Sequence, residues 1–138
     1  MAHLFTYADV AALMPDVRRT AAAIIEVRAE LADLSFAING GEDSPFGGIA
    51  EAKALEARLH ELLGWFTAHD IEVKGAAPIV SDFPAQLLAA PVLLCWLEGE
   101  AELAWYHRAE LGFLGRRRLP PEAMVCVVIV GVAAAIAL

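Results

Sequence analysis

The stretch PVLLCWLEGEAELAWYHR, residues 91–108, decides the fold of this chain. Two runs rich in apolar and aromatic residues, Pro91 to Leu97 and Glu102 to Arg108, flank a short polar segment, which is the pattern of a β-hairpin. A two-residue turn at Gly99 and Glu100 pairs Trp96 with Leu103, Leu94 with Trp105 and Val92 with His107 on one face, and leaves Cys95, Ala104, Leu93 and Tyr106 on the other. We therefore expect both tryptophans in the core and Tyr106 on an exposed face.

Shorter extended segments precede this hairpin. Ile71 to Lys74 reads as a short strand that ends at Gly75, and Pro78 to Phe83 as a second one that ends at Pro84. The sequence therefore predicts a small, mostly antiparallel sheet over about residues 71–108.

The N-terminal half has the periodicity of helices. Thr6 and Asp9 form a capping box for a helix that starts near Tyr7, and Pro15 is expected to break it before a longer helix continues to about Ile38. Apolar residues recur along that helix at coiled-coil spacing: Val17, Ile24, Leu31 and Ile38, with Val27 and Leu34 between them.

A second amphipathic helix is expected from about Ile49 to His69, after the connector around Asn39-Gly40-Gly41 and Pro45. Two apolar stripes of this kind most simply face each other in an antiparallel hairpin. The predicted fold class is α+β, a long antiparallel helical hairpin followed by the sheet. We expect a single domain over residues 1–121 and a separate apolar tail over 122–138.

Charge and composition exclude some classes of function. Eighteen acidic and ten basic residues give a net charge of -8 and a pI near 4.9, so the surface repels nucleic-acid phosphates and no nucleic-acid partner is expected. The N-terminus lacks an export signal, which favours a cytoplasmic location. Cys95 and Cys126 have no C-x-x-C spacing, so the sequence indicates neither a zinc motif nor a disulfide framework.

The apolar tail, Met124 to Leu138, has three readings. Its β-branched run Val125 to Val130 fits a buried strand or a dimer contact. A helix of fifteen residues spans about 22 Å, short of the roughly 30 Å hydrocarbon core, which makes a membrane anchor marginal. Atypical coding is the third reading.

Candidate catalytic and metal-binding residues surround the hairpin. Asp82 and His107 are the candidates for an acid–base pair or a divalent metal site, and Glu100 is a further catalytic candidate. The alternative is a structural Asp82–His107 pair. No cofactor motif occurs in the sequence, so no cofactor is expected.

Three further residue groups have a functional and a structural reading. Arg116, Arg117 and Arg118 either bind an anion or pair with carboxylates of the same sheet. Tyr106 is the candidate exposed aromatic. Cys95 has no charged neighbour two positions away, which favours an inert thiol.

The chain also resembles a known family. The residues that carry the resemblance are Phe5-Thr6, Ala8-Asp9, Leu13-Met14-Pro15, Val80 to Ala85, Cys95-Trp96, Gly99-Glu100, Trp105-Tyr106-His107 and Gly112-Phe113-x-Gly115-Arg116-Arg117. Over roughly residues 4–119 they resemble DUF2203, a family of small bacterial proteins without an assigned activity. The resemblance supports the architecture and implies no reaction.

The leading functional hypothesis is an interaction or scaffolding protein. Seam-like helices without named catalytic motifs favour self-association, as a dimer, and an unidentified protein partner. The alternatives are a small metal- or anion-dependent enzyme at Asp82 and His107, and a peripheral membrane protein anchored by residues 124–138.

Overall fold

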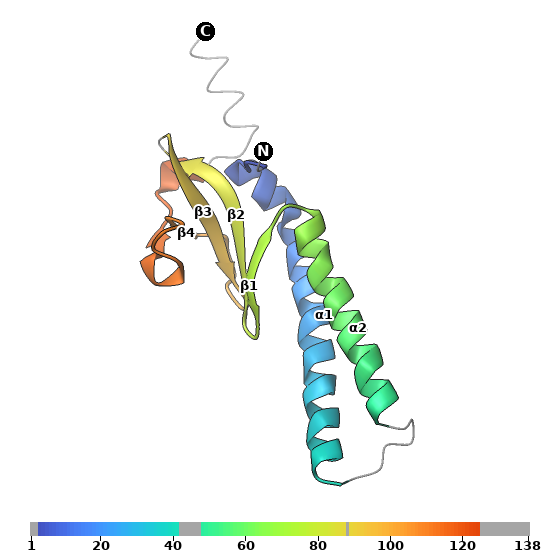
Figure 1. Ribbon diagram of the computed structural model, residues 1–138. Coiled ribbons are helices and arrows are strands. Elements are labelled where there is room, and N and C mark those ends of the chain that lie inside the picture. The colour runs from blue at the N-terminus through green and yellow to red at the C-terminus, as the bar shows by residue number, and fades with distance from the viewer. Residues whose placement is uncertain (1–2, 42–47, 88, 125–138) are drawn as a thin grey trace. The chain divides into compact units, whose positions relative to one another are not determined.

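The computed structural model describes residues 3–41, 48–87 and 89–124 (Figure 1). In these ranges two helices precede five strands, which confirms the predicted α+β class. The chain divides into two compact units, Met1–Pro15 with Asp70–Leu138, and Asp16–His69. The first contains the sheet and the start of helix α1, and the second contains the helical hairpin.

Helix α1 spans Tyr7–Asn39 and starts where the capping box predicts. The Asp9 N–H donates to Thr6 Oγ1 at 3.0 Å, and the Thr6 N–H donates to Asp9 Oδ2 at 2.9 Å. The expected break at Pro15 is wrong, because α1 continues through it. A proline inside a helix removes one backbone hydrogen bond, and the remaining bonds on both sides hold the helix together.

The helical unit pairs the Asp16–Asn39 part of α1 with α2, Ile49–Ala68, which run antiparallel (Figure 1). Its buried apolar residues are Val17, Ala21, Ile24, Leu62 and Phe66. The later seam residues Val27, Leu31, Leu34 and Ile38 are only half-buried. The predicted heptad stripe is therefore buried in its first half alone.

The sheet has the strand order β1-β2-β3-β4-β5, with every described pair antiparallel. The strands are β1 Glu72–Ala76, β2 Ile79–Leu87, β3 Ala90–Leu97, β4 Trp105–His107 and β5 Arg117–Arg118. The sequence did not predict β5, which is two residues long and pairs with β4.

Strand β2 does not end at Pro84, as the sequence predicted, but continues to Leu87. The Phe5 N–H donates to the Pro84 carbonyl at 2.7 Å. Within a strand the N and the C=O of one residue point to the same edge, so the donor that Pro84 lacks would lie on the edge away from β3. Pro84 therefore leaves the β2–β3 ladder intact.

The predicted register of β3 with β4 is also wrong, by one residue. The observed partners are Leu93 with His107, Leu94 with Tyr106, and Cys95 with Trp105. Because β4 starts only at Trp105, a longer loop replaces the two-residue turn. In that loop Glu100 accepts hydrogen bonds from the Leu97 N–H through its carboxylate and from the Trp96 indole through its carbonyl, at 2.7 and 3.0 Å.

The shift moves Trp105 and His107 to the face of the sheet that carries Cys95, since neighbouring residues of a strand point to opposite faces. Trp96 stays on the other face with Leu94. The sequence placed Trp96 and Trp105 on the same face, and in the structure only Trp96 remains on that face.

The apolar tail from Val125 onward lies outside the described residues, and its three readings stay predictions. In the part of the chain that is described, neither helix combines the length and apolar character that crossing a membrane requires.

Candidate metal centre

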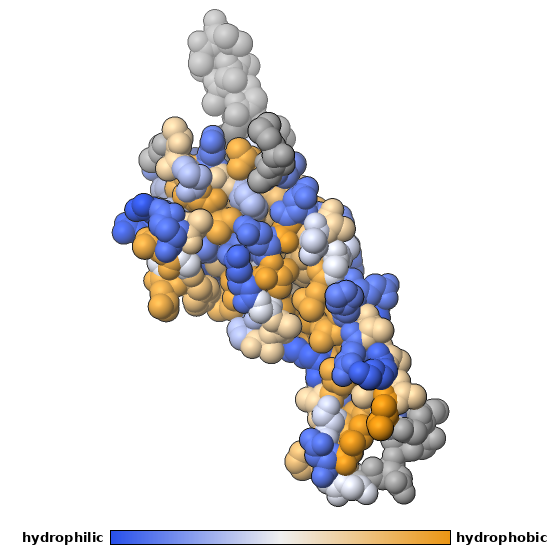
Figure 2. Space-filling view, viewed as in Figure 1, coloured by the Kyte–Doolittle hydropathy of each residue, from blue (hydrophilic) through white to orange (hydrophobic). Residues whose placement is uncertain are grey.

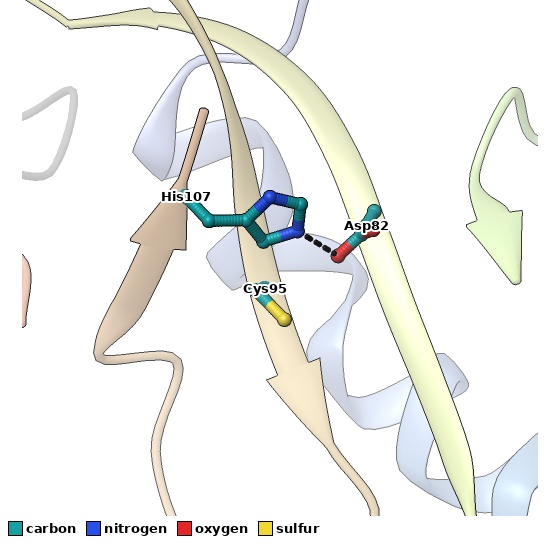
Figure 3. Close-up of side chains that lie close together, drawn as sticks. All are labelled: Asp82, Cys95 and His107. Carbon is teal, nitrogen blue, oxygen red and sulfur yellow. Dashed lines mark ion pairs between the residues drawn. The ribbon is translucent and has the colours of Figure 1, made fainter. Parts of the chain in front are cut away.

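Three neighbouring strands bring one side chain each to a common point on one face of the sheet. Asp82 on β2 is the register partner of Cys95 on β3. His107 on β4 pairs with Leu93, two residues from Cys95 and therefore on the same face. Figure 3 shows the Asp82 and His107 side chains directed at one another, with the Cys95 thiol beside them.

The three side chains are buried and close together. Asp82 is 1% exposed, His107 2% and Cys95 0%. One oxygen of Asp82, one ring nitrogen of His107 and the sulfur of Cys95 all lie within 4.8 Å of one another. His107 Nε2 and Asp82 Oδ1 are 3.1 Å apart. The group has the donor types and the spacing of a metal site.

The other ring nitrogen fixes the tautomer of His107. Nδ1 lies 2.9 Å from the Arg108 backbone carbonyl, which only accepts hydrogen bonds, so Nδ1 carries the proton. In the neutral ring Nε2 then has a lone pair directed at Asp82. Metal-binding histidines are commonly oriented in this way, by donating their second N–H to a carbonyl or a carboxylate.

Both facing atoms lack a hydrogen bond of acceptable geometry. Although they are 3.1 Å apart, Asp82 Oδ1 and His107 Nε2 are two of the buried side-chain atoms that no described group satisfies. Leaving a buried polar atom unsatisfied costs about 1 to 3 kcal/mol, and more for a charged group. A cation between the two lone pairs, either a proton or a metal ion, removes that cost.

Cys95 has a strongly perturbed thiol. Burial, and then the negative charge of Asp82, raise the pKa of Cys95 to about 12. Without a metal ion the sulfur therefore carries its proton at neutral pH and is a poor nucleophile. The residues next to Cys95 in the sequence do not indicate this environment, because Asp82 approaches from the neighbouring strand. Pairing Asp82 with Cys95 across β2 and β3 is the signal that reveals it.

A pocket of about 590 Å³ opens over this face, and Asp82 and His107 are among its lining residues. Its other polar lining residues are Glu72, Lys74 and Glu110. The apolar lining residues include Leu4, Val80, Pro84, Pro91, Leu93 and Phe113. All of these residues belong to the sheet unit. Two of the three candidate ligand residues thus line one cavity, although their side chains are buried.

The structure places Glu100 outside the Asp82, Cys95 and His107 group. Its Oε1 accepts from the Leu97 N–H at 2.7 Å and from Arg116 Nη2 at 2.6 Å. Arg116 also donates to the Cys95 carbonyl at 3.3 Å and lies over the Trp105 and Phe113 rings. Glu100 and Arg116 thus have structural contacts beside the site.

The remaining candidates lie apart from the buried group. Arg117 and Arg118 are exposed on β5, and Arg118 lies over the Trp105 ring. Tyr106 is half-buried and, with Arg108 and Arg117, lines a smaller cavity of about 210 Å³. The structure therefore brings together Asp82 and His107, and adds Cys95 to them.

The family model described as "Uncharacterized conserved protein (DUF2203)" matches residues 3–119. The chain belongs to the DUF2203 family. No curated protein and no solved structure matches the chain. Membership confirms the resemblance carried by the sequence motifs, and the matched segment of this DUF2203 protein includes Asp82, Cys95 and His107.

Proposed function

We propose that this DUF2203 protein is a small metal-dependent enzyme that binds a divalent ion of the zinc class through Asp82 Oδ1, Cys95 Sγ and His107 Nε2. One observation carries the proposal. These three donors are buried within 4.8 Å of one another, and two of them have no other partner among the described groups.

The donor set selects the class of metal. A thiolate, an imidazole and a carboxylate suit Zn²⁺ or a similar transition metal, whereas Mg²⁺ and Ca²⁺ prefer oxygen ligands alone. With bonds of about 2.0 to 2.3 Å, tetrahedral ligands lie roughly 3.3 to 3.8 Å apart. The 3.1 Å between Asp82 and His107 is close to that range, so a small outward movement of either side chain suffices.

Three protein ligands leave a fourth position, which is the arrangement of catalytic rather than structural zinc sites. Because Asp82 and His107 line the pocket, a water molecule or a ligand enters from that side. A zinc-class ion there supplies Lewis-acid activation of water or of a carbonyl group. The Arg108 carbonyl orients His107, and Arg116 fixes the backbone at Cys95.

The test is metal stoichiometry together with thermal stability. Purified full-length protein is stripped with a chelator, reloaded with Zn²⁺, and analysed for bound metal and for its melting temperature. We expect one zinc per chain and a rise in melting temperature, both lost in Asp82→Ala, Cys95→Ser and His107→Ala. His60→Ala and Cys126→Ser are matched controls that keep the metal.

A second outcome of the same experiment would refute the metal site. If the wild-type chain binds no zinc-class ion and its melting temperature does not respond to one, the buried group is a structural Asp82–His107 pair. The metal-dependent function is then refuted.

A second proposal concerns the helical unit, for which we infer self-association as a dimer. Phe36 is 81% exposed, and Ile25 and Ile49 are also exposed on this unit, where Figure 2 shows apolar surface along the hairpin. Exposed apolar groups of this size favour contact with another chain. Light scattering after size exclusion should give a dimer that Phe36→Ser weakens. A monomer at high concentration would refute it.

A further inference from the structure

The pocket above the proposed metal site has walls that indicate what it binds. Six strand residues supply apolar surface, Val80, Pro84, Ala85, Pro91, Val92 and Leu93, and Leu4, Ala109 and Phe113 add to it. Burial of apolar ligand surface against such walls is the main source of affinity in small-molecule sites. The walls therefore accept a largely apolar body.

The charged residues at the pocket already have partners. Lys74 Nζ lies 3.4 Å from Glu72 Oε1, and Glu110 accepts from Arg108 Nε at 2.7 Å. Among the lining residues, Asp82 and His107 each have a buried side-chain atom without a hydrogen bond, Oδ1 and Nε2. The polar atoms without a partner thus lie at one point, where a metal ion would bind. We expect the polar head group of a ligand at this point.

The mouth of the pocket exposes apolar side chains. In the described part of the sheet unit the exposed large apolar residues are Leu4, Leu111, Phe113 and Leu114, and two of them, Leu4 and Phe113, line this pocket. Clustered exposed apolar groups mark surfaces that another molecule covers. A ligand that reaches from the site to Leu4 and Phe113 would cover this surface.

Charge decides the chemistry of the head group. Zinc held by the Asp82 carboxylate, the Cys95 thiolate and neutral His107 has no net charge, and Lys74, the cation in the lining, is paired with Glu72. A phosphate dianion would add two negative charges to a protein of net charge -8, at a pocket whose described lining residues include no cation besides Lys74. A carbonyl-type oxygen adds one negative charge or none.

From these observations, and resting on the proposed metal site, we infer that the pocket takes an acyl compound, such as an ester or amide, with its carbonyl at the metal and its apolar chain between Leu93 and Phe113. The volume of about 590 Å³ lies within the range of roughly 300 to 1,000 Å³ of small-molecule pockets. Lewis-acid activation of such a carbonyl toward water is the reaction class that this placement serves.

Two hydroxamates of different chain length distinguish the contribution of the apolar chain to binding affinity from that of the head group. Octanohydroxamate and acetohydroxamate share the metal-binding group and differ by six methylenes, and calorimetry on the zinc-loaded full chain gives both dissociation constants. Each buried methylene is worth about 0.8 kcal/mol, so we expect octanohydroxamate to bind at least about tenfold more tightly even if the chain is only partly buried.

Two variants from one loop provide the structural control. Phe113 lines the pocket, whereas Leu114 is 98% exposed and does not. Phe113→Ser should weaken octanohydroxamate binding several-fold and leave acetohydroxamate binding unchanged. Leu114→Ser should change neither dissociation constant.

The failure of this inference is distinct from that of the metal proposal. Equal affinities for the two hydroxamates on a protein that holds zinc overturn the acyl pocket and leave the metal site standing. Octyl phosphate binding more tightly than octanohydroxamate overturns the carbonyl head. If zinc does not bind, the metal proposal has failed. In that case, thermal shifts of the metal-free chain with octanoate and with acetate test whether the pocket binds an apolar chain. Equal shifts for the two compounds would overturn the apolar pocket.

Discussion

Asp82 and His107 meet at 3.1 Å although they lie on strands that are not neighbours, because β3 runs between β2 and β4. Their side chains reach each other over the small side chain of Cys95, which is paired with Asp82. A larger residue at position 95 would occupy that space. The closeness of the carboxylate and the imidazole therefore depends on a cysteine between them.

We predict that Asp82 and His107 are strongly coupled in the metal-free protein. His107→Ala leaves the space of a buried ring empty beside Asp82, and large-to-small changes at buried positions typically cost about 2 to 5 kcal/mol. His107→Ala should therefore lower the free energy of unfolding by that amount. Asp82→Ala combined with His107→Ala should cost less than the sum of the single changes. Urea unfolding of all four proteins measures the coupling, and additive effects would contradict it.

Cys95 should resist thiol reagents in the metal-free protein. Its burial and the raised pKa, about 12, keep the sulfur protonated and inaccessible at pH 8. In the Cys126→Ser background we expect Cys95 to react with a disulfide reagent only at the rate at which the sheet opens. Reaction as fast as that of a free thiol would contradict the burial of Cys95.

The same thiol predicts a pH dependence of stability. An acid whose pKa is raised by folding is more easily ionised in the unfolded chain, so stability falls as pH rises from the ordinary value of 9.0 toward about 12. Metal-free wild type should lose stability over that interval more steeply than Cys95→Ser. Urea unfolding at several pH values measures the difference, and parallel profiles would argue against it.

Arg116 should contribute far more to stability than its neighbour Arg117. Its guanidinium donates to Glu100 and to the Cys95 carbonyl and lies over two aromatic rings, whereas Arg117 is exposed. Removing a half-buried, hydrogen-bonded charge leaves Glu100 without that partner, which typically costs about 2 to 4 kcal/mol. Arg116→Ala should show this loss in denaturant unfolding. Arg117→Ala should stay within about 0.5 kcal/mol of wild type.

The capping box supplies a prediction that is independent of the site. Thr6→Ala removes the hydroxyl that accepts the Asp9 N–H, which should cost about 1 kcal/mol of unfolding free energy. The hydrogen bonds with Thr6 lower the pKa of Asp9. The stability that these hydrogen bonds add is therefore present above the ordinary carboxyl pKa and is lost as pH falls. Thr67→Ala, at an exposed position near the end of α2, is the control. Equal stabilities for the two variants would contradict the cap.

Local chemistry made much of the fold predictable. The Thr6 and Asp9 cap fixed the start of α1, and apolar periodicity located both helices and the strands around Cys95 and His107, because each signal depends on residues close in the sequence. The predicted ends of the helix at Pro15 and of the strand at Pro84 are wrong for the opposite reason. Whether a proline ends an element depends on which backbone partner it deprives of a hydrogen bond, and for Pro84 that edge faces away from β3.

The sequence by itself determined the fold class, the family and the two residues, Asp82 and His107, that deserved testing. The tertiary structure alone decided that they meet and that Cys95 joins them. The physical reason is the two-residue period of a β-strand: alternation gives the faces within each strand, but a shift of one residue between strands exchanges every side chain across the sheet. The loop around Glu100 sets that shift, and its hydrogen bonds to Leu97 and Trp96 form only in the folded chain.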